Sequence, residues 1–114
     1  MTDPPTINRF AVVLVPTQAY LAWSQSCPDG DPNTELDEVQ EDPTVFLIPE
    51  SEPEPEKCLR RYYKVMFEQE LGSWCTDPAF WPEDLSFATF KEFFTIHLST
   101  MVFDLGTGRI IRED

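Results

Sequence analysis

Two short apolar runs, each closed by a proline, predict the first two strands. Residues 10–15 read Phe-Ala-Val-Val-Leu-Val before Pro16, and residues 44–48 read Thr-Val-Phe-Leu-Ile before Pro49. Continuous runs of this length, rich in β-branched residues, are typical of strands that are covered on both faces. The 28 residues between the runs exceed the dozen that a crossover needs, so we expect two parallel neighbouring strands.

Between these runs the pattern becomes helical, but only briefly. After Thr17, a possible N-cap, Tyr20 and Leu21 indicate a helix of about two to three turns that ends at residues 27–30, Cys-Pro-Asp-Gly. Residues 34–39 carry too little apolar surface to hold a helix against the domain. We therefore expect a loop or a marginal helix there.

The clearest helix follows the second apolar run. Ser51 and Glu54 have the spacing of a capping box, and Gly72 offers a C-terminal stop. The residues at i, i+3 and i+4 spacing between them are apolar. They are Leu59, Tyr62, Tyr63, Met66, Phe67, Leu71 and Trp74.

The last third of the chain predicts one more helix and one more strand. A helix starts at about Ser86, with an apolar stripe that consists of Phe87, Phe90, Phe94, His97 and Leu98. Residues 100–105 have the composition of a third strand. Residues 109–112 form either a short edge strand or a cover for the sheet.

The element order is β-α-β-α-α-β, with a further strand as an option. It predicts an α/β or α+β fold, in which about three helices pack on a small mixed or parallel sheet of three to four strands. A ferredoxin-like sandwich also alternates in this way, but it needs two further strands for which the sequence has no signal. We expect residues 1–114 to form a single domain.

Charge changes this picture, because it is concentrated in one segment. The chain has 21 acidic and 8 basic residues, a net charge of -13. Residues 28–56, which include the strand at 44–48, hold 11 of the acids, no base and six of the eleven prolines. Such a segment is either a solvated surface or a recognition surface for a basic partner. The acidic balance argues against direct binding of nucleic acid.

Other composition features narrow the class of protein. The N-terminus lacks a signal-peptide pattern and the longest apolar run is far below a membrane span, so we expect a cytoplasmic protein that binds no membrane. Cys27, Cys58 and Cys75 are widely spaced, which argues against a disulfide framework and a zinc site and predicts reduced thiols. We find no cofactor or metal motif and expect neither.

Candidate catalytic residues are few. His97 is the only histidine, and its helical spacing predicts a partly buried structural role. If the strands are parallel, Thr17, Gln18, Glu50, Ser51 and Asp104 share the edge where α/β folds bind ligands. A small enzyme or a metal- or ligand-binding domain that uses Glu50 and Asp104, with His97 as the imidazole, is therefore the alternative function.

Large aromatic residues in turn sequence favour a different function. Trp74, Phe80 and Trp81 lie in a segment where Asp77-Pro78 predicts a single helical turn. These rings either fill the core between helices or form an interface. With the acidic residues Glu35, Glu38 and Glu41, they predict a non-enzymatic module that binds a basic protein. Monomer and homodimer both remain open.

Overall fold

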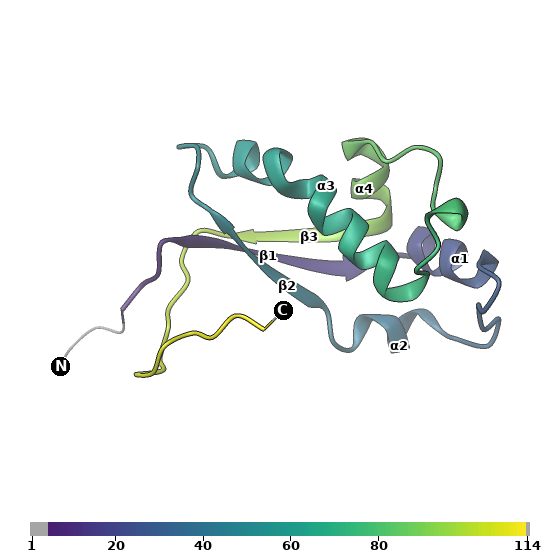
Figure 1. The fold of residues 1–114 in the computed structure, drawn as a ribbon, viewed down its shortest axis with the longest axis horizontal. Helices are drawn as coiled ribbons and strands as arrows, with labels where there is room; N and C mark the ends of the chain where they lie inside the picture. Colours follow the sequence, from purple (N-terminus) through teal and green to yellow (C-terminus); the bar gives the residue numbers. More distant parts are fainter. Residues whose placement is uncertain (1–4, 114) are drawn as a thin grey trace.

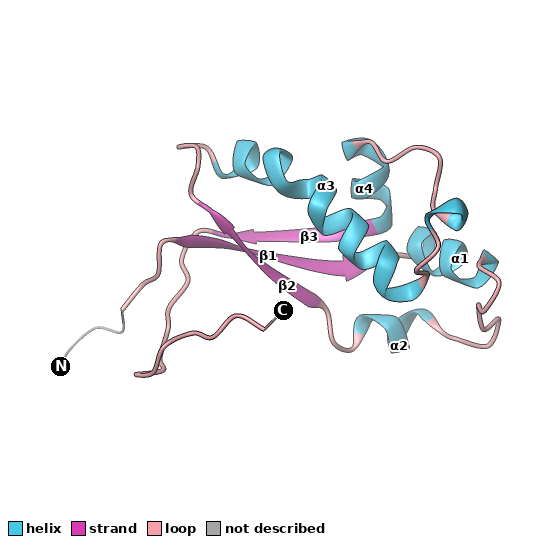
Figure 2. Cartoon of the chain, in the orientation of Figure 1, coloured by secondary structure: helices cyan, strands magenta, loops and turns pink. Residues whose placement is uncertain are grey.

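Along the chain, the first and the last element that the structure describes are strands, and the helices come between them in sequence (Figures 1 and 2). The computed structural model describes residues 5–113. Its elements are β1 (Arg9–Pro16), α1 (Gln18–Ser26), α2 (Leu36–Gln40), β2 (Thr44–Pro49), α3 (Pro55–Trp74), the 3-10 helix η1 (Pro78–Phe80), α4 (Phe87–Phe93) and β3 (Phe94–Ser99). The fold is α+β, one of the two classes that the sequence predicts.

β1 is the central strand of an antiparallel sheet in the order β2-β1-β3. Its side chains alternate between buried positions, such as Val12 and Leu14, and half-buried positions, such as Val13. Val13 pairs with Val45 on β2 and with His97 on β3, so these three side chains share one face. Figure 2 shows α3 and α4 on one side of the sheet and the C-terminal tail on the other.

The helices cover only one face of the sheet, whereas the apolar runs predict cover on both. On the helix-free face, Val45 is 55% exposed and Leu47 is 46% exposed. Ile110 and Arg112 of the tail line a hollow of about 490 Å³ with Leu47 and Arg9 at the end of this face. The tail thus reaches the open face, as one of the two predicted roles for residues 109–112 requires.

The prediction of parallel β1 and β2 is wrong, because the connection between them stays at one end of the sheet. The connection is long enough to return to the start of β1, but the Gln40 side chain of α2 donates a hydrogen bond to the Pro16 carbonyl at the end of β1. Figure 1 shows α1 and α2 beyond the end of β1, and β2 starts from that same end. The long crossover runs instead through α3, from β2 to β3, which are parallel to each other on either side of β1.

The core lies between the sheet and the helices and is rich in phenylalanine. Phe67 of α3 is fully buried at its centre. Its ring centroid lies 5.4 Å from that of Phe90, 5.5 Å from that of Phe93 and 6.1 Å from that of Phe94. Tilted and edge-to-face pairs at these distances add to the free energy gained from burial alone. α3, α4 and β3 are held together at this point.

The predicted helix at 86–98 is only half correct. α4 starts after Ser86, whose hydroxyl accepts a hydrogen bond from the Thr89 amide, but it ends at Phe93, and β3 begins at the next residue. From Phe94 to Ser99 apolar and polar residues alternate, which is the period of a strand. The helical stripe and the strand pattern overlap at Phe94, and cross-strand pairing with β1 decides between them.

The predicted strand at 100–105 is wrong for a related reason. Because β3 already occupies the free side of β1, residues after Ser99 have no sheet edge left to join beside β1. They run as a tail that pairs with the N-terminal segment through a single bridge between Thr6 and Phe103. The Ile7 amide donates to the Val102 carbonyl at 2.9 Å.

The other helices agree with the sequence, apart from their caps. α1 and α3 have the expected positions, the marginal helix exists as α2, and η1 is the single turn after Asp77. Thr17 occupies the N-cap of α1, but its hydroxyl donates to the Glu92 carbonyl instead of capping the helix. Ser51 does not cap α3, because this helix begins at Pro55 with Glu54 as N-cap.

Gly30 allows the chain to fold back against the end of α1. A Cβ atom at this position would collide with the backbone carbonyl oxygens of Ser24 and Gln25. We expect Gly30→Ala to lower the free energy of unfolding by about 1 kcal/mol, the lower end of the overpacking range, because a turn near the surface shifts more easily than a core. Urea unfolding measures this. Gly108→Ala is the control, since a Cβ there meets no atom within 4 Å, and equal effects would contradict the expectation.

Candidate functional site

One end of the molecule combines acidic and aromatic side chains. α1, α2, the second half of α3 and η1 meet there, beyond the end of β1 (Figure 1). Residues 10–56 and 65–90, which supply these segments, contain no lysine or arginine. Trp74, the last residue of α3, borders two hollows at this end. The electrostatic potential around these hollows is therefore set by carboxylates.

The larger hollow, which we name the Asp77 hollow, has a volume of about 410 Å³. It is lined by Cys27, Pro28, Asp29, Trp74, Cys75, Thr76, Asp77 and Phe80. The Asp77 carboxylate caps η1 by accepting from the Ala79 amide at 3.0 Å. Trp74 is 39% exposed and Phe80 is 46% exposed, so both rings present apolar area beside two carboxylates.

The three predicted aromatic residues divide into two roles. The Trp81 indole N–H donates to the Cys75 carbonyl at 2.9 Å, its ring packs over Gly72, and the residue is partly buried. The Trp74 indole N–H donates to the Ser24 carbonyl at 3.1 Å, which fixes the orientation of a ring that stays half exposed. Trp81 is thus a packing residue, whereas Trp74 and Phe80 are available for contact.

The smaller hollow, which we name the Glu70 hollow, has a volume of about 150 Å³. It lies between the end of β1, the start of β2 and α3. Its lining residues are Leu14, Pro16, Tyr20, Val39, Asp42, Pro43, Thr44, Glu70 and Trp74. The set combines apolar walls, two aromatic rings and two carboxylates.

Glu70 is the unusual residue of this hollow, because it is a carboxylate that is only 9% exposed. Its Oε1 atom is buried and has no hydrogen-bond partner. Burial raises the pKa of Glu70, and the nearby Thr44 side chain opposes this rise. Burial and the nearby Glu70 carboxylate also raise the pKa of Tyr20, whose hydroxyl donates to the Glu70 backbone carbonyl at 3.3 Å.

Sequence reasoning missed Glu70, although a signal was present. Glu70 lies between Met66, Phe67, Leu71 and Trp74 on the buried stripe of α3. A charged residue on such a stripe rarely becomes buried unless something pairs with it. Tyr20, Asp42 and Thr44 carry no comparable signal, because only the tertiary fold brings their segments next to α3.

The predicted acidic partner-binding residues flank the Glu70 hollow. Glu35 is the N-cap of α2, Glu38 lies within it and Glu41 is its C-cap, and all three are exposed. The same short helix contributes Val39 to the wall of the hollow. The Gln40 side chain donates to the Pro16 carbonyl at 2.8 Å and ties α2 to the end of β1.

The predicted edge with Thr17, Gln18, Glu50, Ser51 and Asp104 does not form. In the antiparallel sheet Arg9 pairs with Pro49, so Glu50 follows at the end of the sheet opposite to Thr17. Glu50 is exposed, and the Asp104 carboxylate accepts from the Gly106 amide at 2.9 Å within a turn. Neither Glu50 nor Asp104 lines the two hollows.

His97 also differs from its predicted setting. It is exposed on β3, on the helix-free face of the sheet, and is not on a buried helical stripe. Cys58 lies on α3, and Cys27 and Cys75 are the C-caps of α1 and α3, whereas His97 lies on β3. Burial, together with the neighbouring Cys75 thiol, raises the pKa of Cys27, which keeps this thiol protonated.

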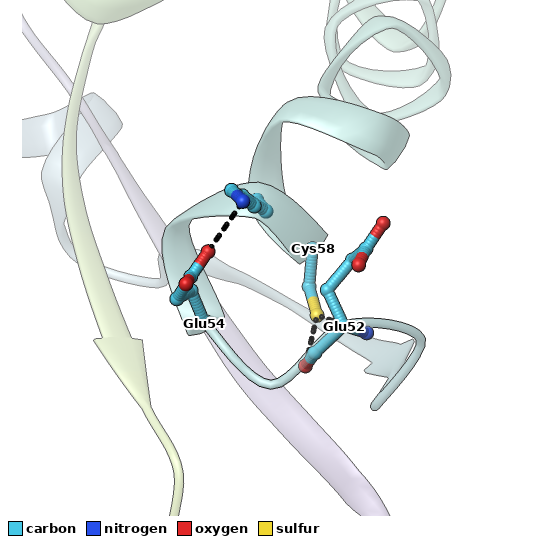
Figure 3. A network of polar contacts seen from close by, with 4 residues as sticks. Glu52, Glu54 and Cys58 are labelled. Carbon is cyan, nitrogen blue, oxygen red and sulfur yellow. Dashed lines mark hydrogen bonds and ion pairs between the residues drawn. The ribbon is translucent and has the colours of Figure 1, made fainter.

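Polar contacts at the start of α3 are structural (Figure 3). The Cys58 thiol is fully buried and donates to the Glu52 carbonyl at 3.3 Å, and it accepts from the Glu52 amide. Lys57 and Glu54 form an exposed ion pair at 2.8 Å. Within residues 5–113 this is the only ion pair, so the carboxylates at the acidic end lack a basic partner among the described residues.

The described part of the chain has no metal-binding cluster and no membrane-spanning helix, and the chain has no match among known proteins. Among the described residues, no three His, Cys, Asp or Glu side chains gather closely enough to hold a metal ion. No helix in this part of the chain has the length and apolar character needed to cross a membrane. No family model, curated protein or solved structure matches the chain.

Proposed function

We propose that this protein is a cytoplasmic, non-enzymatic interaction domain that binds a basic protein through its acidic end. The observation that carries the proposal is the half-exposed Trp74, which stands between two hollows whose charged side chains are all carboxylates. Aromatic residues are enriched in interface cores, and a field of one sign steers a partner of opposite charge. The exposed acids on α2 supply that field.

The distribution of basic residues supports the same proposal. Five of the eight lie on the first half of α3 and on α4, namely Lys57, Arg60, Arg61, Lys64 and Lys91. Arg60 and Lys91 stand over the Phe87 ring, at 4.5 and 5.5 Å from its centroid. None of these five cations lines either hollow.

Neutralising the acids of α2 tests the proposal. We expect the triple variant Glu35→Gln, Glu38→Gln, Glu41→Gln to slow association with a basic peptide such as hexalysine about tenfold, because exposed charges act mainly on the association rate. Stopped-flow mixing with a labelled peptide, at low ionic strength and at 0.15 M salt, measures the rate. The difference in association rate between the triple variant and the unmodified protein should be smaller at 0.15 M salt.

A matched triple variant separates a specific surface from net charge. Glu50→Gln, Glu56→Gln, Glu113→Gln removes the same charge at exposed positions outside α2 and away from the acidic end. We expect less than a twofold change in its association rate. Equal slowing by both triple variants, or no binding of hexalysine to the unmodified protein at low salt, would count against the proposal. Capture of partners from lysate at low and high salt then identifies the basic protein.

A further inference from the structure

Two of the three cysteines line the same hollow, although they lie far apart in the sequence. Cys27 is the C-cap of α1 and Cys75 is the C-cap of α3, and both line the Asp77 hollow. Cys27 is buried, Cys75 is partly exposed, and both are free thiols in the structure. The third cysteine, Cys58, lies near the start of α3 and does not line this hollow.

One carbonyl oxygen brings the two helix ends together. The Ser24 carbonyl accepts a hydrogen bond from the Cys27 amide at 3.3 Å and another from the Trp74 indole N–H at 3.1 Å. Trp74 directly precedes Cys75 in the chain. The Cys27 backbone and the side chain of the residue before Cys75 therefore meet at the same oxygen atom.

The two other tryptophans hold the same region. The Trp23 indole N–H donates to the Phe80 carbonyl at 2.9 Å and so joins α1 to η1. The Trp81 indole N–H donates to the Cys75 carbonyl at 2.9 Å and joins the segment after η1 to the end of α3. With the Trp74 bond, these contacts connect the three segments around the hollow. The backbones that carry the two thiols are thus positioned in advance, which lowers the entropic cost of a reaction between them.

The two thiol groups are neighbours, and each is held only weakly. The Cys75 thiol, together with burial, raises the pKa of Cys27. The Cys27 thiol donates to the Trp23 carbonyl at 3.5 Å, and the Cys75 thiol donates to the Asp77 carbonyl at 3.7 Å. Thiols are weak hydrogen-bond donors, so these contacts leave both side chains able to rotate toward each other.

The hollow also gives a small reagent access to Cys75. Its volume of about 410 Å³ is many times the ~30 Å³ that a water molecule occupies. The partly exposed Cys75 reacts before the buried Cys27, because thiol reactivity depends on access and on deprotonation. The carboxylates of Asp29 and Asp77 line the same hollow, so an uncharged reagent enters more easily than an anion.

We propose that Cys27 and Cys75 form a reversible intramolecular disulfide by exchange with a low-molecular-weight disulfide. Cys75 loses its proton to solvent, and its sulfur attacks the reagent, breaks the S–S bond and releases one thiolate. Cys27 then loses its proton, and its sulfur attacks the Cys75 sulfur and releases the second thiolate. Both protein thiols are oxidised, and the reagent is reduced to two thiols that take up the two protons. This redox site does not depend on the proposed function.

Peptide mapping after exposure to bis(2-hydroxyethyl) disulfide, an uncharged reagent, tests the proposal. The folded protein is incubated without oxygen, quenched with acid, treated with N-ethylmaleimide in urea to block free thiols, and digested with trypsin. The lysines and arginines place the three cysteines in three different tryptic peptides, namely 10–57, 58–60 and 65–91. We expect peptides 10–57 and 65–91 to be joined by a bond that dithiothreitol breaks, and Cys58 to carry the maleimide.

The same reaction on protein unfolded in urea is the control. Cys58 is closer in sequence to Cys27 and to Cys75 than these two are to each other, so loop closure in an unfolded chain favours bonds to Cys58. We expect the ratio of the Cys27–Cys75 bond to the bonds with Cys58 to be at least about tenfold higher in the folded protein than in urea.

A pair of variants links the bond to stability. In Cys58→Ala the two cysteines of the hollow remain, and we expect oxidation to raise the Tm by about 5 °C or more, because a cross-link restricts the unfolded chain. In Cys75→Ser the same treatment should leave the Tm unchanged. Thermal unfolding followed by circular dichroism measures both.

The outcomes that overturn the proposal are distinct from one another. All three cysteines carrying maleimide after the incubation would show that the two thiols only pack in the hollow. A mixed disulfide that persists on Cys75 would show that the Cys27 sulfur does not reach it. A ratio of bonds in the folded protein equal to that in urea would show that the fold does not direct the pairing. Because the mapping uses the unmodified protein, it decides even if a variant fails to fold.

Discussion

Phe67→Ala is expected to lower the free energy of unfolding by about 3–5 kcal/mol, the range for large-to-small changes at buried phenylalanines. Phe67 is fully buried and its ring contacts those of Phe90, Phe93 and Phe94. Alanine leaves a cavity at the point where α3, α4 and β3 meet. Chemical unfolding in urea, followed by circular dichroism, measures the loss. This loss is a large part of the free energy of unfolding of a small domain, which is typically about 5–15 kcal/mol.

The control for this prediction lies two residues earlier on the same helix. Val65 is 70% exposed, and Val65→Ala should change the free energy of unfolding by less than about 0.5 kcal/mol. A small loss in Phe67→Ala, of the size seen in Val65→Ala, would contradict the packing of α3 against α4 and β3.

Glu70→Gln is expected to have the opposite sign and to raise the free energy of unfolding at pH 7 by about 2 kcal/mol. In the free protein the Glu70 carboxyl group is buried and one of its oxygens lacks a partner, which gives its ionised form a desolvation cost. The neutral amide of glutamine has nearly the same shape and a smaller cost of burial. Thermal and urea unfolding at neutral pH measure the gain.

The pH dependence of this gain follows from the raised pKa of Glu70. Folding favours the protonated carboxyl, so the stabilising effect of protonation is fully present below the unfolded-state pKa and is lost as pH rises through the higher folded-state pKa. The difference between Glu70→Gln and the unmodified protein should therefore be large at pH 7 and small below about pH 4. Unfolding curves collected across this pH range test the expectation.

Glu68→Gln is the control for the titration, because Glu68 is exposed on the same helix. Its free energy of unfolding should follow that of the unmodified protein within about 0.5 kcal/mol at each pH. A Glu70→Gln variant that is less stable than the unmodified protein at pH 7 would show that the carboxylate has a partner in the free protein.

The elements with strong local patterns could be predicted from the sequence. The apolar run before Pro16, the run before Pro49 and the long stripe from Leu59 to Trp74 correspond to β1, β2 and α3. Each pattern involves residues that are close together in the sequence, so burial of one face of the element produces a regular spacing of apolar residues in the sequence. The helix and strand that meet at Phe94 could not be separated in this way, because both periods place that residue in the core.

The candidate site was only partly visible in the sequence. The acidic segment, Trp74 and Phe80 were identified, and the structure places them at the same end of the molecule. Trp81 is a packing residue instead, and Glu50, Asp104 and His97 lie apart from both hollows. The predictions for Glu50, Asp104 and His97 depended on the direction of the strands and on the residue at which α4 ends.

The sequence by itself determined the positions of β1, β2 and the long helix α3, the presence of both helices and strands, and the concentration of charge in residues 28–56. Tertiary structure alone decided the antiparallel direction of β2, since α1 and α2 stay at the end of β1 from which β2 then starts. It also decided that Glu70, Asp42 and Tyr20 share one hollow. Local periodicity records which face of an element is buried, whereas a shared hollow depends on contacts between segments far apart in the chain.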